Sequence, residues 1–137
     1  LSGNRNHGAV VVSGPAGVTT ALVIRDSLLS NNFGGVFGWS PEAAGKVNLI
    51  LSNNTIADNS YFGIRAYQGY ASEVSLMLSN NTITGNSVGV RLEQGVPDGT
   101  PARSAPDLPQ AFTRQDNTIS GNGTDVQGGS LIPLEAR

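Results

Sequence analysis

The chain has 137 residues, 38% of them hydrophobic and 13% charged, with a formal net charge of −2 and no cysteine. This composition fits one domain and excludes a disordered chain, a disulfide scaffold and thiolate metal sites. The small negative charge provides no electrostatic footprint for nucleic acid, and no apolar run approaches the roughly 20 residues of a membrane helix. We therefore expect neither nucleic-acid binding nor membrane insertion.

One segment is repeated along much of the chain. Gapless copies cover residues 21–32, 48–59 and 75–86, and residues 115–122 match the second half of a copy. The last asparagine of each copy serves as a marker, which gives Asn4, Asn32, Asn59, Asn86 and Asn122. These markers are 28, 27, 27 and 36 residues apart, and the longest interval holds a Pro- and Gly-rich loop insertion over 94–112. Such a period is typical of a solenoid.

Each copy alternates apolar and polar residues with period two, which predicts short strands. Three rows of equivalent aliphatic residues recur, and they begin at Leu22 with Ile24, at Leu29 and at Val36. Stacking the copies in register would bury these rows and pair each strand in parallel with its equivalents, about 4.8 Å apart. The sequence therefore predicts an all-β parallel β-helix of about 4–5 coils, each about 27 residues long.

Asparagines recur where the first strand of each copy ends. Asparagine tolerates the left-handed backbone of tight corners, and stacked amides can hydrogen-bond from coil to coil. We therefore predict a structural asparagine ladder that contains Asn53, Asn54, Asn80, Asn81 and Asn117, with Asp26 and Asp116 at the position of Asn53.

The segment Asn-Asn-Thr-Ile-x-x-Asn, followed by Gly-(Ile/Val)-x, resembles the coil repeat of the right-handed parallel β-helix family, the pectate-lyase-like repeat proteins. The resemblance covers most of the chain. It implies a right-handed solenoid in an exported protein that is extracellular, on the cell surface or periplasmic. Relatives include polysaccharide lyases, glycoside hydrolases, epimerases and non-catalytic surface proteins, so the fold does not select an activity.

The two ends of the repeat predict a piece of a larger β-helix. We expect residues 1–137 to form a single β-helix domain that is a fragment, or the C-terminal part, of a longer protein. Residues 130–137 break the repeat and are expected to form a C-terminal tail or cap. Arg114 falls at the position held by Leu51 and Leu78 in other copies, a conflict that follows the insertion directly.

If the aliphatic rows point inward, their neighbours point outward and form two partly apolar stripes. The stripe on the Gly-(Ile/Val) strands supplies the candidate ligand or interface residues Phe37, Trp39, Arg65, Tyr67 and Arg91, and the other stripe holds Val23, Ile50 and Met77. Three explanations are open. A homo-oligomer or the rest of the parent chain could cover the stripes, the aromatic residues could bind polysaccharide with help from the two arginines, or the register could slip at the strand ends.

Signals for catalysis are few. Glycoside hydrolysis needs two carboxyl groups about 5–10 Å apart, and the repeat brings no two acids together. The candidate catalytic residues are Glu93 with Asp98 or Asp107 in the loop, and Glu93 is also the expected partner of the two arginines. The acidic cluster that holds calcium in the lyase relatives is missing. One histidine and no cysteine argue against a zinc site, and we expect no metal and no cofactor.

The leading functional prediction is a non-catalytic β-helix scaffold of an exported bacterial surface or periplasmic protein, which mediates assembly or glycan contact. The alternative is a polysaccharide-active enzyme, a lyase, hydrolase or epimerase, with its groove on the outer strands and loops.

Overall fold

The computed structural model describes residues 1–40, 45–69, 72–95, 109–114 and 116–134, and every regular element in these ranges is a β-strand. The strands of the first half are β1 (His7–Val12), β2 (Thr19–Arg25), β3 (Leu28–Ser30), β4 (Gly34–Ser40), β5 (Lys46–Ser52), β6 (Thr55–Ala57) and β7 (Phe62–Gln68). The strands of the second half are β8 (Glu73–Ser79), β9 (Thr82–Thr84), β10 (Val88–Gln94), β11 (Gln110–Thr113), β12 (Thr118–Ile119), β13 (Thr124–Gln127) and β14 (Leu131–Pro133).

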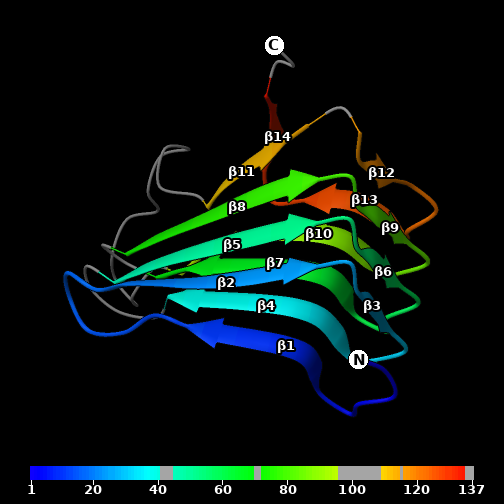
Figure 1. Cartoon of the computed structure of the whole chain (residues 1–137), viewed down its shortest axis with the longest axis horizontal. Helices are drawn as coiled ribbons and strands as arrows, with labels where there is room; N and C mark the ends of the chain where they lie inside the picture. Colours follow the sequence, from blue (N-terminus) through cyan, green and yellow to red (C-terminus); the bar gives the residue numbers. More distant parts are fainter. Residues whose placement is uncertain (41–44, 70–71, 96–108, 115, 135–137) are drawn as a thin grey trace.

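The strands stack into three parallel sheets (Figure 1), in the orders β1-β4-β7-β10-β13, β14-β11-β8-β5-β2 and β12-β9-β6-β3. Successive strands along the chain belong to different sheets, which is the arrangement of a parallel β-helix and confirms the predicted fold class. The regular part comprises about three turns, β2–β4, β5–β7 and β8–β10, slightly fewer than the predicted 4–5 coils. The fourth set follows the insertion and has shorter strands of 4, 2 and 4 residues.

The predicted aliphatic rows form the core. Leu49 pairs with Leu76, Ile56 with Ile83 and Ile64 with Val90, and each of these side chains is at most 1% exposed. Burying one such side chain stabilises a fold by about 1.5–3 kcal/mol. Since no single coil can bury its own apolar face, the core exists only because the coils stack in register.

Three expectations concern the C-terminal part of the chain. The expected insertion at 94–112 begins at the last residue of β10 and includes most of β11, and its residues 96–108 lie outside the described ranges. Within the expected tail or cap at 130–137, Leu131–Pro133 form β14, and Leu131 packs against the core in register with Ala111. Residues 135–137 of this segment lie outside the described ranges. Arg114 is exposed, because Thr113 takes the position beside Leu78.

Two asparagine ladders run along the first corner. The outer ladder is exposed: the Nδ2 of Asn53 donates to Asp26 Oδ1 at 2.5 Å, and the Nδ2 of Asn80 donates to Asn53 Oδ1 at 3.0 Å. All three residues have a positive φ of 51–57°, which Asn and Asp adopt more readily than other side chains. The exposed ladder therefore serves mainly to shape the corner.

The inner ladder is buried. Asn81 Oδ1 accepts hydrogen bonds from the backbone N–H and the Nδ2 of Asn54, at 3.0 and 3.1 Å. Asn81 Nδ2 donates in turn to the carbonyl of Leu51 at 2.8 Å and to Asn117 Oδ1 at 3.1 Å. Each amide thus satisfies corner groups of two coils that would otherwise be buried without partners.

The marker asparagines form a second buried ladder at the next corner. The sequence predicted the spacing of these residues but not their hydrogen-bonded ladder. Asn59 donates to Asn86 Oδ1 through its backbone N–H at 3.0 Å and its Nδ2 at 2.8 Å. At the C-terminal end, Asp125 Oδ1 accepts from both the N–H and the Nδ2 of Asn122, at 3.3 and 3.0 Å. Asp125 therefore replaces the asparagine of a further coil and closes the ladder.

Candidate functional site

The candidate ligand residues lie on the outer face of the sheet that contains β4, β7 and β10. Along β4, Val36 and Gly38 are buried, while the alternate residues Phe37 and Trp39 point outward. In parallel register, Phe37 pairs with Arg65, Trp39 with Tyr67, and Arg65 with Arg91. The register does not slip at the strand ends, so this explanation of the stripe is excluded.

Phe37, Trp39, Arg65 and Tyr67 line a groove of about 340 Å³, which we call the aromatic groove. The rings of Phe37 and Trp39 are nearly parallel, with an interplanar angle of 9° and centroids 6.1 Å apart. The guanidinium of Arg65 lies over the Phe37 ring, 4.8 Å from its centroid, and 5.9 Å from the centroid of Tyr67. Trp39 keeps 38% of its surface exposed, so a ring face is accessible.

Two further hollows lie elsewhere. One of about 430 Å³ is lined mainly by polar residues, with Phe33 as its one aromatic residue. The other, of about 370 Å³, is lined by residues of the C-terminal end and has no aromatic lining. The aromatic groove alone among these three combines several ring faces with a cation.

A carboxylate holds the two arginines beside the groove. Glu93 accepts a hydrogen bond from the Nε of Arg65 at 2.6 Å and forms an ion pair with the Nε of Arg91 at 2.5 Å. All three side chains are no more than 25% exposed. Arg91 also donates to the hydroxyl of Tyr61. Paired arginines on adjacent strands would repel each other, and Glu93 offsets this repulsion. The cluster of two arginines and one glutamate retains one net positive charge.

Of the candidate catalytic residues, Glu93 alone lies in the part of the chain that the structure describes, so the grouping of Glu93 with Asp98 or Asp107 stays a prediction. Glu93 is engaged by both guanidinium groups, as expected from the sequence, and Asp98 and Asp107 lie outside the described residues. Within the described ranges, no group of three or more His, Asp or Glu side chains could hold a metal ion. No helix in this part is long and apolar enough to cross a membrane.

An aromatic floor beneath the groove was missed by the sequence analysis. Phe62 is fully buried, and its ring lies 6.1 Å from that of Phe37 and 5.4 Å from that of His7. Glycine at position 34 makes room for it, because a Cβ there would collide with the Phe62 ring. The sequence does contain a signal for this packing. A glycine, Gly34, stands one coil before the large Phe62 at the same register position.

His7 packs among these rings, and its Nε2 is buried without a hydrogen-bond partner in the described structure. Burial lowers the pKa of this imidazole below its ordinary value of 6.5, and the positive charge of Arg65 lowers it further. The fold therefore favours the neutral ring.

We expect the stability of the protein to fall as pH drops below 6.5, because the unfolded chain then binds a proton that folded His7 resists. The contribution of His7 is fully present above pH 6.5 and is lost as the pH falls through the window between 6.5 and the lower folded pKa. His7→Gln should flatten the dependence, measured by denaturant unfolding at a series of pH values. His7 is the only histidine, so its imidazole NMR titration reports the pKa directly, and a midpoint at or above 6.5 would contradict this account.

In comparisons with known proteins, no family model, no curated protein and no solved structure matches this chain. The geometry of the aromatic groove is therefore the basis on which a function is inferred.

Proposed function

We propose that this chain is a non-catalytic β-helix scaffold that contacts a glycan through the aromatic groove. The observation that carries the proposal is the pair of parallel rings, Phe37 and Trp39, with Arg65 lying over Phe37. The C–H face of a sugar ring is apolar and can pack on an aromatic face, while its hydroxyl groups remain in water. A strand-borne platform of this kind is rigid, so little conformational entropy is lost on binding.

The charge of the site favours a glycan that carries anionic groups. Arg65 and Arg91 bring two positive charges, and Glu93 neutralises one of them. Guanidinium groups form strong, directional hydrogen bonds with carboxylate or sulfate groups. A bound anion would complete the neutralisation of the cluster.

The setting that we propose is a pectate-lyase-like β-helix in an exported bacterial surface or periplasmic protein. Its support is the resemblance of the coil repeat to that family, together with the parallel β-helix. A solenoid offers long, flat strand faces along which an extended polymer can lie.

Affinity electrophoresis in gels that contain pectin, alginate or a neutral glucan tests the proposal. At least one anionic polysaccharide should retard the parent chain, because it engages both the rings and the arginines. Trp39→Ala and Tyr67→Ala should each weaken binding by up to about tenfold, since each removes up to about 1.5 kcal/mol of ring contact. Thr82→Ala, an exposed change on β9, is the matched control and should bind like the parent. If no polysaccharide retards the parent, or the groove variants migrate like it, the groove is not a glycan site.

The alternative, a polysaccharide-active enzyme, is decided by product formation. Incubation with the same polymers should release no reducing sugar and no unsaturated uronate. Release of either product that is abolished in Glu93→Ala, with binding retained, would replace the non-catalytic proposal with the enzymatic one.

A further inference from the structure

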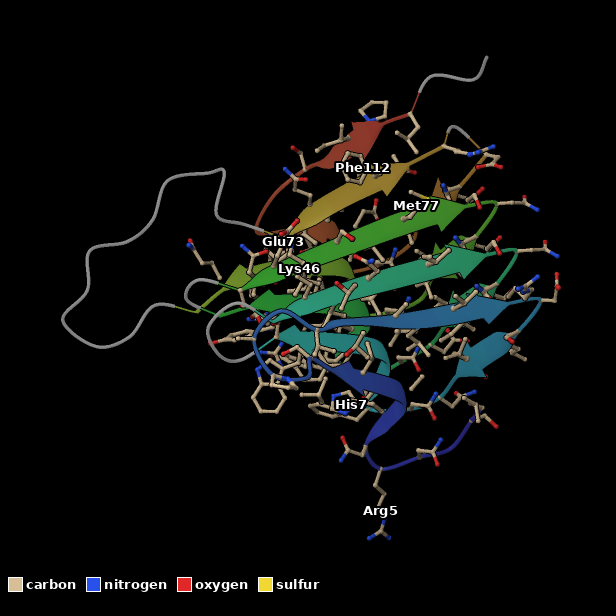
Figure 2. All side chains as sticks on the ribbon, turned by 60° about the vertical axis from the view of Figure 1, so that its left-hand side comes forward. Arg5, His7, Lys46, Glu73, Met77 and Phe112 are labelled. Carbon is tan, nitrogen blue, oxygen red and sulfur yellow. The ribbon has the colours of Figure 1, made fainter. Side chains whose placement is uncertain are left out.

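A second apolar stripe lies on a different sheet from the groove. Val23, Ile50, Met77, Phe112 and Ile132 occupy one register row on the outer face of the sheet β14-β11-β8-β5-β2. Four of them are well exposed: Val23 49%, Ile50 37%, Met77 45% and Ile132 41%. Met77 and Phe112 stand on adjacent strands of this face (Figure 2). A contiguous exposed row of this kind marks an interaction surface.

A pair of opposite charges flanks the stripe. The Nζ of Lys46 lies 3.2 Å from an Oε of Glu73, which is the ion pair that the repeat predicts. Both residues begin their strands, β5 and β8, and their side chains are 55% and 62% exposed. Each therefore has capacity for a second partner of opposite charge. The positive charge of Lys46 lies on β5 and the negative charge of Glu73 lies on the adjacent β8.

We propose that this face binds a second copy of the chain, related by a two-fold axis that runs parallel to the strands between β5 and β8. This rotation places Lys46 against the partner's Glu73, and Glu73 against the partner's Lys46. Along the stripe it places Ile50 against the partner's Met77. The same operation sets the small Val23 against the large Phe112 of the partner, so the combined size of facing side chains stays similar.

At the other end of the face, the same rotation brings Arg25 opposite Arg114 of the partner, which is a contact between like charges. Asp26 and Asp116, which lie next to these arginines in the sequence, offset the repulsion, so the charge complementarity of the face comes from Lys46 and Glu73. A two-fold axis along the solenoid would instead set Lys46 against the uncharged corner that follows β5. Charge complementarity therefore selects the axis parallel to the strands.

The size of the face sets the expected strength. With this axis β2, β5, β8 and β11 face strands of the partner, whereas β14 has no counterpart. Three strands about 23 Å long and one about 13 Å long, at about 4.8 Å spacing, cover about 400 Å², so two copies would bury roughly 800 Å² in projection. This area lies below the roughly 1,200–2,000 Å² of stable interfaces, so we expect a weak, reversible dimer with a dissociation constant in the micromolar range or above.

Sedimentation velocity of the whole chain across the micromolar range tests for the dimer. The parent should shift from monomer to dimer with rising concentration. Ile50→Lys and Met77→Lys should weaken association at least a hundredfold, because each buries two uncompensated charges per dimer. Thr82→Lys on β9 adds the same charge away from the face and should leave association unchanged. A parent that remains monomeric at all concentrations would overturn the proposal, while circular dichroism verifies that each variant is folded.

Two charge reversals test the orientation of the partner. Lys46→Glu and Glu73→Lys should each weaken self-association on the order of tenfold, because like charges then face each other across the axis. An equimolar mixture of the two variants should form a heterodimer as strong as the parent dimer. Each variant still carries two like charges within its own chain, so this recovery can arise only across the interface. A mixture no stronger than its components would show that Lys46 and Glu73 do not meet across a dimer.

Discussion

Replacing Asn81 with alanine is expected to cost roughly 2–6 kcal/mol of unfolding free energy, a large part of the stability of a small domain. The substitution leaves the buried N–H of Asn54 and the carbonyl of Leu51 without the partner that Asn81 provides. Each unsatisfied buried group costs about 1–3 kcal/mol. Urea unfolding followed by circular dichroism measures the loss.

Asn80→Gly is the matched control. Asn80 stands beside Asn81 but is exposed, and its side chain donates one hydrogen bond, to Asn53 Oδ1. Glycine accepts the positive φ of 51° at this corner without strain, so the loss should stay below about 1 kcal/mol. Equal losses for the two variants would mean that the buried ladder does not hold the coils together.

Gly63→Ala is expected to destabilise the protein by about 3 kcal/mol, at the upper end of the range for overpacking. A Cβ at this position would lie 2.7 Å from the carbonyl oxygen of Gly89 and 3.1 Å from Cγ2 of Ile83. The carbonyl belongs to the backbone of the next coil, which cannot retreat without breaking the parallel pairing of β7 and β10. Thermal unfolding should therefore show a clear fall in Tm.

Gly14→Ala provides the comparison for Gly63→Ala. A Cβ at Gly14 would meet the side chain of Val18 at 3.1 Å, and this exposed side chain can rotate away. We expect a change within about 1 kcal/mol of the parent. A loss at Gly14 as large as that at Gly63 would indicate that glycine flexibility, rather than close approach of the coils, decides the effect.

The repeated part of the fold could be predicted because each coil places equivalent residues at the same register. Leu49 and Leu76, or Lys46 and Glu73, are 27 residues apart in the sequence and directly paired in the structure. The prediction failed where that spacing changes. Leu78 and Asn81 are three residues apart, whereas their equivalents Thr113 and Asn117 are four apart, so one extra residue in the corner displaced Arg114 from the predicted core position.

The groove was predicted in part for the same reason. Alternation along β4 and β7 placed Phe37, Trp39, Arg65 and Tyr67 on one outer face. The aromatic floor was not predicted, because the register row of Phe62 holds Gly34 and Val88 in the neighbouring coils. Because the side chains in this row differ in size from coil to coil, the row leaves no repeated pattern in the sequence. The packing of Phe62 into the space beside Gly34 is visible only in the three-dimensional structure.

The two proposed surfaces belong to different sheets, so their tests are independent. Changes on the stripe at Ile50 or Met77 should leave polysaccharide retardation in place, and Trp39→Ala should leave the dimer in place. Loss of both properties in one variant would indicate a folding defect and would be visible by circular dichroism.

Fluorescence titration of Trp39 with acidic oligosaccharides tests the central claim most directly. The chain has one tryptophan, so its emission reports on the aromatic groove alone. We predict a saturable change in emission in the parent and in Thr82→Ala, and a saturation point shifted by up to about tenfold in Tyr67→Ala. The contradicting result is an emission spectrum that no oligosaccharide changes, although the chain is folded and an acidic polysaccharide still retards it in the gel. Glycan binding would then lie outside this groove.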